Sequence, residues 1–275
     1  MNNRIVKAIG NSINFVSYFS SYYAAHLAIN LFSRPQKGKT KISESKFLNT
    51  SIKEALTINN FSIMTYRWTG TKDTVLLAHG WESNASRWKN LIELLKSNNY
   101  NIVALDAPAH GNSGSKLFNA LMYSECISMV AKKFNANIIV GHSVGGMASI
   151  FAQKNHHIQS LNKLVLLGAP ADFLGVFNRY EKMMGYNAKV SNAMHKYVLK
   201  HYNHLPEYFS AANFSKEIKA KGLIIHDKKD RIIPFKDALK YKENYKNSEL
   251  ISTRGQGHGL KSEQVYEHIL EFLNA

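Results

Sequence analysis

Short apolar runs alternate with longer stretches of helical spacing along most of the chain. The apolar runs predict buried strands: FSIMTYRW, DTVLLAHG, YNIVALD, NIIVGHS, LNKLVLLG, AKGLIIHD and SELIST. Between them, apolar residues three or four positions apart predict helices, as in NASRWKNLIELLKSNN and SEQVYEHILEFL. Apolar strands separated by helices predict an α/β protein with a mostly parallel, doubly wound sheet.

One segment breaks this alternation. Residues 171–213 contain helical patterns and many aromatic residues but no predicted strand. The segment follows a strand end, at the edge where open α/β sheets place their ligand crevices. We therefore predict a core formed by residues 61–170 and 214–275, with residues 171–213 inserted into it as a small helical lid.

The N-terminal residues 1–33 have an amphipathic pattern, which predicts one extra helix packed on the main domain. The apolar residues that recur at helical spacing are Ile5, Ile9, Ile13, Val16 and Tyr23. Polar residues interrupt this stretch and its polar side is rich in serine rather than lysine, so contact with a membrane surface is the less favoured interpretation. Residues 34–60 begin with a proline, a glycine and several charges, and are expected to form a linker and a first strand region.

The chain is strongly basic, with 35 Lys and Arg against 19 Asp and Glu and a formal net charge of +16. The basic residues are spread out, with no long block and no arginine-rich arm, so we expect no specific nucleic-acid partner. The single cysteine, Cys126, lies in a predicted helix and permits no intrachain disulfide. No H-E-x-x-H or comparable cluster occurs, so no metal is implied. We expect a cytoplasmic protein.

The stretch GHSVG has the pattern of a nucleophile elbow. Ser143 lies between Gly141 and Gly145, after a predicted strand and before a predicted helix. A very tight strand-to-helix turn requires small residues on either side of the serine. The helix that follows would offer the Val144 backbone N–H, at the positive end of its dipole, to an oxyanion.

A serine nucleophile needs a histidine to take its proton and an acid to orient that histidine, in the chain order Ser, acid, His. Asp230 in DRIIP and His258 in GQGHG follow later strands in that order. Asp172 and Asp227 are alternative acids. The alternative histidines are His110, His142, His195, His201 and His204. Of these, His142 is better placed to shape the elbow than to act as a base.

A second oxyanion donor is expected after the strand DTVLLA. There His79 and Gly80 let the chain turn, so that the Trp81 backbone N–H points into the site.

Together these motifs resemble those of the α/β-hydrolase superfamily, in particular serine hydrolases of the esterase and lipase type. The segments that carry the resemblance are HGW, LDAPAHGNSG, GHSVGG, HDKKDRIIP and GQGHG, in that order. The resemblance implies a triad of Ser143, Asp230 and His258, acyl-enzyme chemistry and no cofactor. Ala109 stands where the fourth-strand motif of this superfamily usually has glycine, for which we expect only a small change in the turn. HGW also lacks the triple glycine of one esterase branch.

These inferences predict a serine hydrolase that cleaves a small-molecule carboxylic ester or thioester. Three alternatives share the fold: a carbon–carbon bond hydrolase, a cofactor-free haloperoxidase, and a protein that uses the pocket only for binding.

Overall fold

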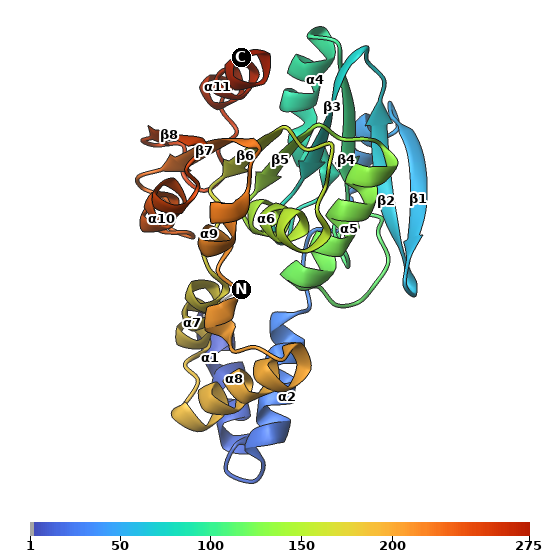
Figure 1. The fold of residues 1–275 in the computed structure, drawn as a ribbon. Helices are drawn as coiled ribbons and strands as arrows, with labels where there is room; N and C mark the ends of the chain where they lie inside the picture. The colour runs from blue at the N-terminus through green and yellow to red at the C-terminus, as the bar shows by residue number, and fades with distance from the viewer. Residues whose placement is uncertain (1–2) are drawn as a thin grey trace. The chain divides into compact units, whose positions relative to one another are not determined.

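The computed structural model describes residues 3–275, which divide into two compact units (Figure 1). One unit contains the chain up to Arg34 together with Asp172–Ser210, and we call it the helical unit. The other contains Pro35–Ala171 and Ala211–Ala275, and we call it the sheet unit.

The sheet unit is built on one eight-stranded sheet with the strand order β1-β2-β4-β3-β5-β6-β7-β8. Its strands are β1 (Ile52–Ile58), β2 (Phe61–Trp68), β3 (Lys72–Ala78), β4 (Tyr100–Leu105), β5 (Ile138–His142), β6 (Lys163–Leu167), β7 (Lys221–Asp227) and β8 (Ser248–Thr253). Strands β4, β3, β5, β6, β7 and β8, which are neighbours in that order, pair in parallel. Strand β2 pairs antiparallel with both β1 and β4. The predicted mostly parallel sheet is confirmed, and its parallel strands all end at the same edge.

Helices cover both faces of this sheet (Figure 1). Those of the sheet unit are α3 (Ile42–Leu48), α4 (Lys89–Ser97), α5 (Ala120–Lys133), α6 (Val144–His156), α9 (Ala211–Phe214), α10 (Lys236–Asn244) and α11 (Glu263–Asn274), with the 3-10 turns Ala85–Trp88 and Ser215–Glu217. On one face, α4 and α11 bury Leu91 and Ile269 in a cluster with alternate strand residues such as Val75 and Leu77. On the other face, α6 contacts β3, β5 and β6. Burial on both faces explains why the central strands are continuous apolar runs.

The helical unit consists of α1 (Asn3–Val16), α2 (Ser21–Phe32), α7 (Phe173–Met184), α8 (Ala188–Tyr202) and the 3-10 turn Pro206–Tyr208. The prediction of a single N-terminal helix is wrong. The backbone of Ser20 is extended, and its side chain accepts a hydrogen bond from the Tyr23 N–H, which starts a second helix. Among residues 3–275, no helix is both long and apolar enough to cross a membrane.

The N-terminal helices pack tightly on α7 and α8. A Cβ atom on Gly10 would lie 1.8 Å from the Met184 carbonyl oxygen, so only glycine allows this approach of α1. The Asn14 side chain donates to the Gly185 carbonyl at 2.8 Å and accepts from the Asn187 N–H at 2.8 Å. The N-terminal segment and the inserted segment therefore form one structural unit, although over 130 residues separate them.

Buried histidines hold the loops at the carboxyl ends of β3 and β4. His79 Nε2 accepts from the Ala107 N–H at 2.9 Å, while its Nδ1 donates to the Gly80 carbonyl at 2.7 Å. His110 makes the equivalent pair, with the Glu82 N–H at 3.0 Å and the Pro108 carbonyl at 2.8 Å. Burial lowers the pKa of His79 to about 4 and that of His110 to about 3. Both rings therefore need to be neutral in order to accept these backbone N–H groups.

Gly10→Ala should destabilise the helical unit. Alanine is the better helix former, so the change would stabilise an exposed helix, but here the new methyl group meets a backbone carbonyl. We expect a loss of about 1–3 kcal/mol, measured as faster amide hydrogen exchange in α1 and α7. Asn11→Ala, at the exposed next position, is the control and should slow exchange or leave it unchanged. Equal exchange in the Gly10→Ala and wild-type proteins would contradict the close packing.

His110 should make stability depend on pH below neutrality. Its pKa is lower in the folded chain than the unfolded value of about 6.5, so protons bind preferentially to the unfolded state as pH falls from 6.5 towards 3. This preferential protonation of the unfolded state should lower the free energy of unfolding by about 2 kcal/mol between pH 7 and pH 5. Urea unfolding of wild type and His110→Asn at both pH values isolates this contribution, because other titrating groups are shared. A stability difference between the two proteins that is the same at both pH values would refute it.

Candidate active site

Ser143 occupies a sharp turn between β5 and α6. Its backbone has φ of 52°, a region that side chains other than glycine rarely adopt. A Cβ atom on Gly145 would lie 2.3 Å from the Ala78 carbonyl oxygen, so α6 starts directly against the end of β3. The Ser143 N–H donates to the Leu167 carbonyl of β6 at 2.8 Å. These contacts hold the serine at the edge of the sheet where the parallel strands end.

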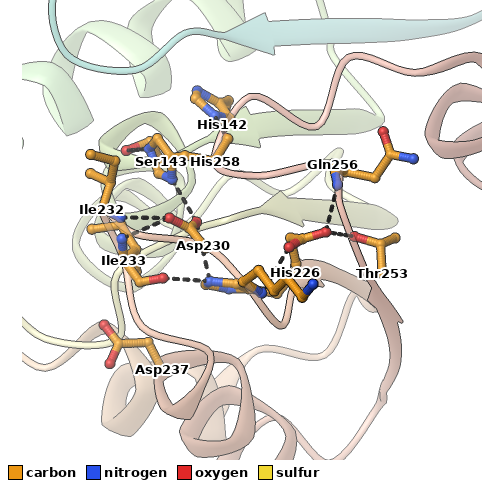
Figure 2. Close-up of polar contacts among 12 residues, drawn as sticks. His142, Ser143, His226, Asp230, Ile232, Ile233, Asp237, Thr253, Gln256 and His258 are labelled. Carbon is orange, nitrogen blue, oxygen red and sulfur yellow. Dashed lines mark hydrogen bonds and ion pairs between the residues drawn. The ribbon is translucent and has the colours of Figure 1, made fainter.

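His258 lies between Ser143 and Asp230 (Figure 2). Its Nε2 is 3.0 Å from Ser143 Oγ, and its Nδ1 is 2.7 Å from Asp230 Oδ2. With the proton on Nδ1, the ring donates to the carboxylate and accepts from the serine hydroxyl. The three residues that the sequence predicted as a set therefore lie in one hydrogen-bonded chain.

The Asp230 side chain is fully buried. Burial alone would raise its pKa, but hydrogen bonds from His226 and His258 outweigh that effect. The other carboxylate oxygen accepts from the backbone N–H groups of Ile232 at 2.8 Å and Ile233 at 3.0 Å. Together these donors hold the pKa of Asp230 well below its usual range, so the carboxylate stays ionised near neutral pH.

His226 was not predicted as a site residue. It lies buried near the end of β7, with Nε2 3.4 Å from Asp230 Oδ2 and 2.9 Å from the Ile233 carbonyl oxygen. The carboxylate of Asp230 thus contacts two histidine rings (Figure 2). The signal in the sequence was a histidine inside the otherwise apolar strand GLIIHD, where a buried polar group requires a partner.

The two alternative acids have other partners. Asp227 accepts from the Thr253 hydroxyl at 2.9 Å and the Gln256 N–H at 2.8 Å, so it anchors the loop that carries His258. Asp172 begins α7 in the helical unit, where its side chain accepts from the Gly175 N–H at 2.6 Å. The structure brings only Asp230, of these three carboxylates, into hydrogen-bond contact with His258.

The His142 side chain contacts the backbone of His258. Its Nε2 donates to the His258 backbone carbonyl at 2.8 Å, and the two ring centroids are 4.9 Å apart. Burial lowers the pKa of His142 well below its usual value, which keeps the ring neutral. His142 therefore fixes the loop that carries His258, while His258 itself is the histidine that lies between Ser143 and Asp230.

The remaining alternative histidines each have local partners. His110 is one of the buried loop anchors described above, and the other three belong to the helical unit. His195 lies 3.6 Å from Glu181, His201 hydrogen-bonds the Tyr197 carbonyl, and His204 stacks on Tyr208.

The two predicted oxyanion donors flank Ser143. Val144 is the first residue of α6, and the Ser143 side chain makes no capping hydrogen bond to this helix. A Cβ atom on Gly80 would lie 2.9 Å from Ser143 Cβ, so the Gly80–Trp81 backbone passes directly beside the serine. Trp81 as a whole residue is 38% exposed, and its ring packs edge-on against His110 and Phe118. Both backbone segments therefore adjoin the serine, while the indole packs on the loop after β4.

The described residues contain no group of three or more His, Cys, Asp or Glu side chains arranged to hold a metal ion.

Comparison with known proteins agrees with this fold. Residues 75–260 match the model of the Alpha/beta hydrolase family. AB hydrolase superfamily protein YisY of Bacillus subtilis is 22% identical over 245 residues, which cover 73% of this chain and 91% of YisY. The "Putative esterase/lipase 2" of Mycoplasma genitalium is 24% identical over 145 residues, 51% of this chain. That match spans 53% of the relative, about half its length.

A solved structure extends the comparison to the three-dimensional fold. The bromoperoxidase of Bacillus anthracis superposes on this chain with a TM-score of 0.63 and 17% identity, covering 82% of this chain and 100% of the other. At that identity the likeness concerns the fold alone. The family match over residues 75–260, together with the eight-stranded sheet and its helices, shows that this chain belongs to the alpha/beta hydrolase family.

Proposed function

We propose that the protein is a serine hydrolase that cleaves a carboxylic ester or thioester through an acyl-enzyme intermediate. One observation carries the proposal: an unbroken hydrogen-bond chain runs from Ser143 Oγ through His258 to the buried carboxylate of Asp230. Membership of the alpha/beta hydrolase family and a relative named as an esterase/lipase support the same chemistry.

The first half of the reaction acylates the serine. His258 Nε2 takes the Ser143 hydroxyl proton as Oγ bonds to the substrate carbonyl carbon, and the carbonyl electron pair moves onto oxygen. The backbone N–H groups of Trp81 and Val144 hold that oxyanion, aided by the positive end of α6. The ionised Asp230 stabilises the imidazolium, which then protonates the leaving alcohol or thiol as the carbon–oxygen or carbon–sulfur bond breaks.

The second half repeats these steps with water. His258 removes a proton from a water molecule, whose oxygen attacks the acyl carbon, and then returns that proton to Ser143 Oγ as the acid leaves. The serine, histidine and aspartate end in their starting protonation states, so the cycle needs no cofactor.

The likeness to a bromoperoxidase makes hydrogen peroxide the second nucleophile to test. Attack of peroxide in place of water on the same acyl-enzyme would release a peracid, and added peroxide would then divert the product. Ester hydrolysis with no effect of peroxide on the product restricts the activity to hydrolysis.

Ser143 and Asp230 should both be required for covalent labelling and ester hydrolysis. We expect Ser143→Ala to abolish fluorophosphonate labelling and to lower kcat on nitrophenyl esters on the order of a million-fold. Asp230→Asn, which keeps the shape but allows the wrong histidine tautomer, should lower kcat by about 10⁴. Labelling and turnover would be measured on purified proteins, with a chain-length series of esters to size the acyl site.

Asp227→Asn is the matched control, because it removes a carboxylate three residues away that anchors the loop without touching His258. Asp227→Asn should lower the melting temperature, with only a small effect on kcat. Full labelling of Ser143→Ala, or a larger kcat loss in Asp227→Asn than in Asp230→Asn, would contradict these roles. A folded wild-type protein that neither labels nor turns over esters would favour a binding-only member of the family.

His226 should act as a positioning residue through Asp230. Removing its Nε2 donor with His226→Leu should lower kcat roughly tenfold, the effect of about 1.4 kcal/mol in the barrier, with KM little changed. His226→Gln, which retains a donor, should recover most of that loss. A kcat loss of the same size in both variants, accompanied by the same drop in melting temperature, would indicate that the ring contributes only packing.

A further inference from the structure

Exposed aromatic side chains gather where α1 ends and α2 begins. Phe15, Tyr18, Phe19, Tyr22 and Tyr23 are all exposed, and Phe19 at the turn is 80% exposed. The rings of Phe15 and Phe19 contact each other edge-on at 5.3 Å. Single exposed apolar residues are common. Here, five aromatic residues lie together at the end of α1, in the connection and at the start of α2, and a patch of this kind is typical of an interaction site.

Three lysines of α8 border these aromatic residues. Lys189 Nζ lies 4.7 Å from the centroid of the Tyr18 ring, and Lys200 Nζ lies 5.4 Å from that of Tyr22. Lys189 and Lys196 also line a hollow of about 440 Å³ together with Ser17, Tyr18 and Phe19. We call these five aromatic residues and three lysines the aromatic–lysine patch; all of it belongs to the helical unit.

The elements that carry the patch have no negative charge. The three acidic residues of the helical unit are Asp172, Glu181 and Glu207, all outside α1, α2 and α8, and the first acidic residue of the whole sequence is Glu44. Helices α1 and α8 contribute five basic residues: Arg4, Lys7, Lys189, Lys196 and Lys200. A second copy of this chain would therefore oppose lysine to lysine, which disfavours self-association through the patch.

Aromatic rings beside lysines suit the interface of a bilayer with anionic lipids. Tyrosine and phenylalanine rings enter the headgroup region, and lysines at its edge pair with phosphate groups. We propose that the aromatic–lysine patch docks the protein on an anionic phospholipid surface, with Phe15 and Phe19 entering the headgroup layer. The proposal is independent of catalysis, so Ser143→Ala should bind vesicles as well as wild type.

The test is co-sedimentation of the full chain with vesicles. Phosphatidylcholine vesicles containing about one third phosphatidylglycerol should pellet the protein at about 0.05 M salt, and much less of it at about 0.5 M salt. Vesicles of phosphatidylcholine alone should pellet little at either salt concentration. Failure to pellet with the anionic vesicles at low salt would overturn the proposal.

Charge variants locate the contact. Replacing Lys189, Lys196 and Lys200 together with glutamine should weaken the partition coefficient about fivefold per lysine, hence on the order of a hundredfold in total. The matched control replaces three exposed lysines of the sheet unit, Lys132, Lys219 and Lys246, with glutamine. Both triple variants lose the same net charge, so equal losses of binding would refute a localised patch.

Aromatic variants test insertion. Phe15→Ser with Phe19→Ser should reduce binding at least tenfold, whereas Ile42→Ser with Leu239→Ser, which removes two exposed apolar side chains of the sheet unit, should not. In Phe19→Trp, the added indole emission should shift to the blue on anionic vesicles after subtraction of the wild-type spectrum. An unshifted emission, or a concentration-dependent dimer that the patch variants abolish, would overturn docking to lipid.

Discussion

The sheet unit depends on how closely the turn at Ser143 approaches the end of β3. There is no room for a side chain at Gly145, because the Ala78 carbonyl lies where a Cβ atom would be, and Gly80 is similarly close to Ser143. This proximity forces the serine into its positive-φ conformation and sets α6 to begin at Val144. The β3–Trp81 segment and the start of α6 thus come to flank one hydroxyl, which the proposed oxyanion role of the Trp81 and Val144 backbone N–H groups requires.

Buried polar side chains then fix the loops that surround the hydroxyl. His79 ties the loop after β3 to the loop after β4, His142 holds the backbone of His258, and Asp227 anchors the segment that leads to it. Burying such groups is costly unless each finds a partner, so these hydrogen bonds restrict the loops to one arrangement. A rigid arrangement of this kind aligns donors and acceptors before a substrate arrives, which is what the proposed acyl transfer requires.

The strands, the elbow and the order of the serine, acid and histidine could be predicted from the sequence because each has a local pattern. The choice between Asp227 and Asp230 could not be derived from spacing, since Asp227 is the last residue of β7 and Asp230 lies only three residues further on. Only the fold of the turn directs one carboxylate towards His258 and the other towards the loop after β8. The strand GLIIHD signalled that His226 is buried and needs a partner, but only the fold shows that this partner is Asp230. Ala109, at φ of 65°, adopts the conformation expected of the glycine it replaces, so the turn itself is retained.

The helical unit shows a second limit of local patterns. Residues 1–33 looked unsuited to a membrane surface because their polar side is serine-rich, and that composition is correct. Packing, however, places the lysines of α8 beside the aromatic residues of α1 and α2, so the basic rim comes from a segment more than 150 residues away. The net charge of +16 therefore indicates a binding partner only when the fold shows where the basic residues lie. Helices α1, α2 and α8 contain no carboxylate, so positive charge is concentrated next to exposed aromatic rings. The proposed docking on an anionic lipid surface follows from that combination, because such a surface has an apolar layer beneath its charges.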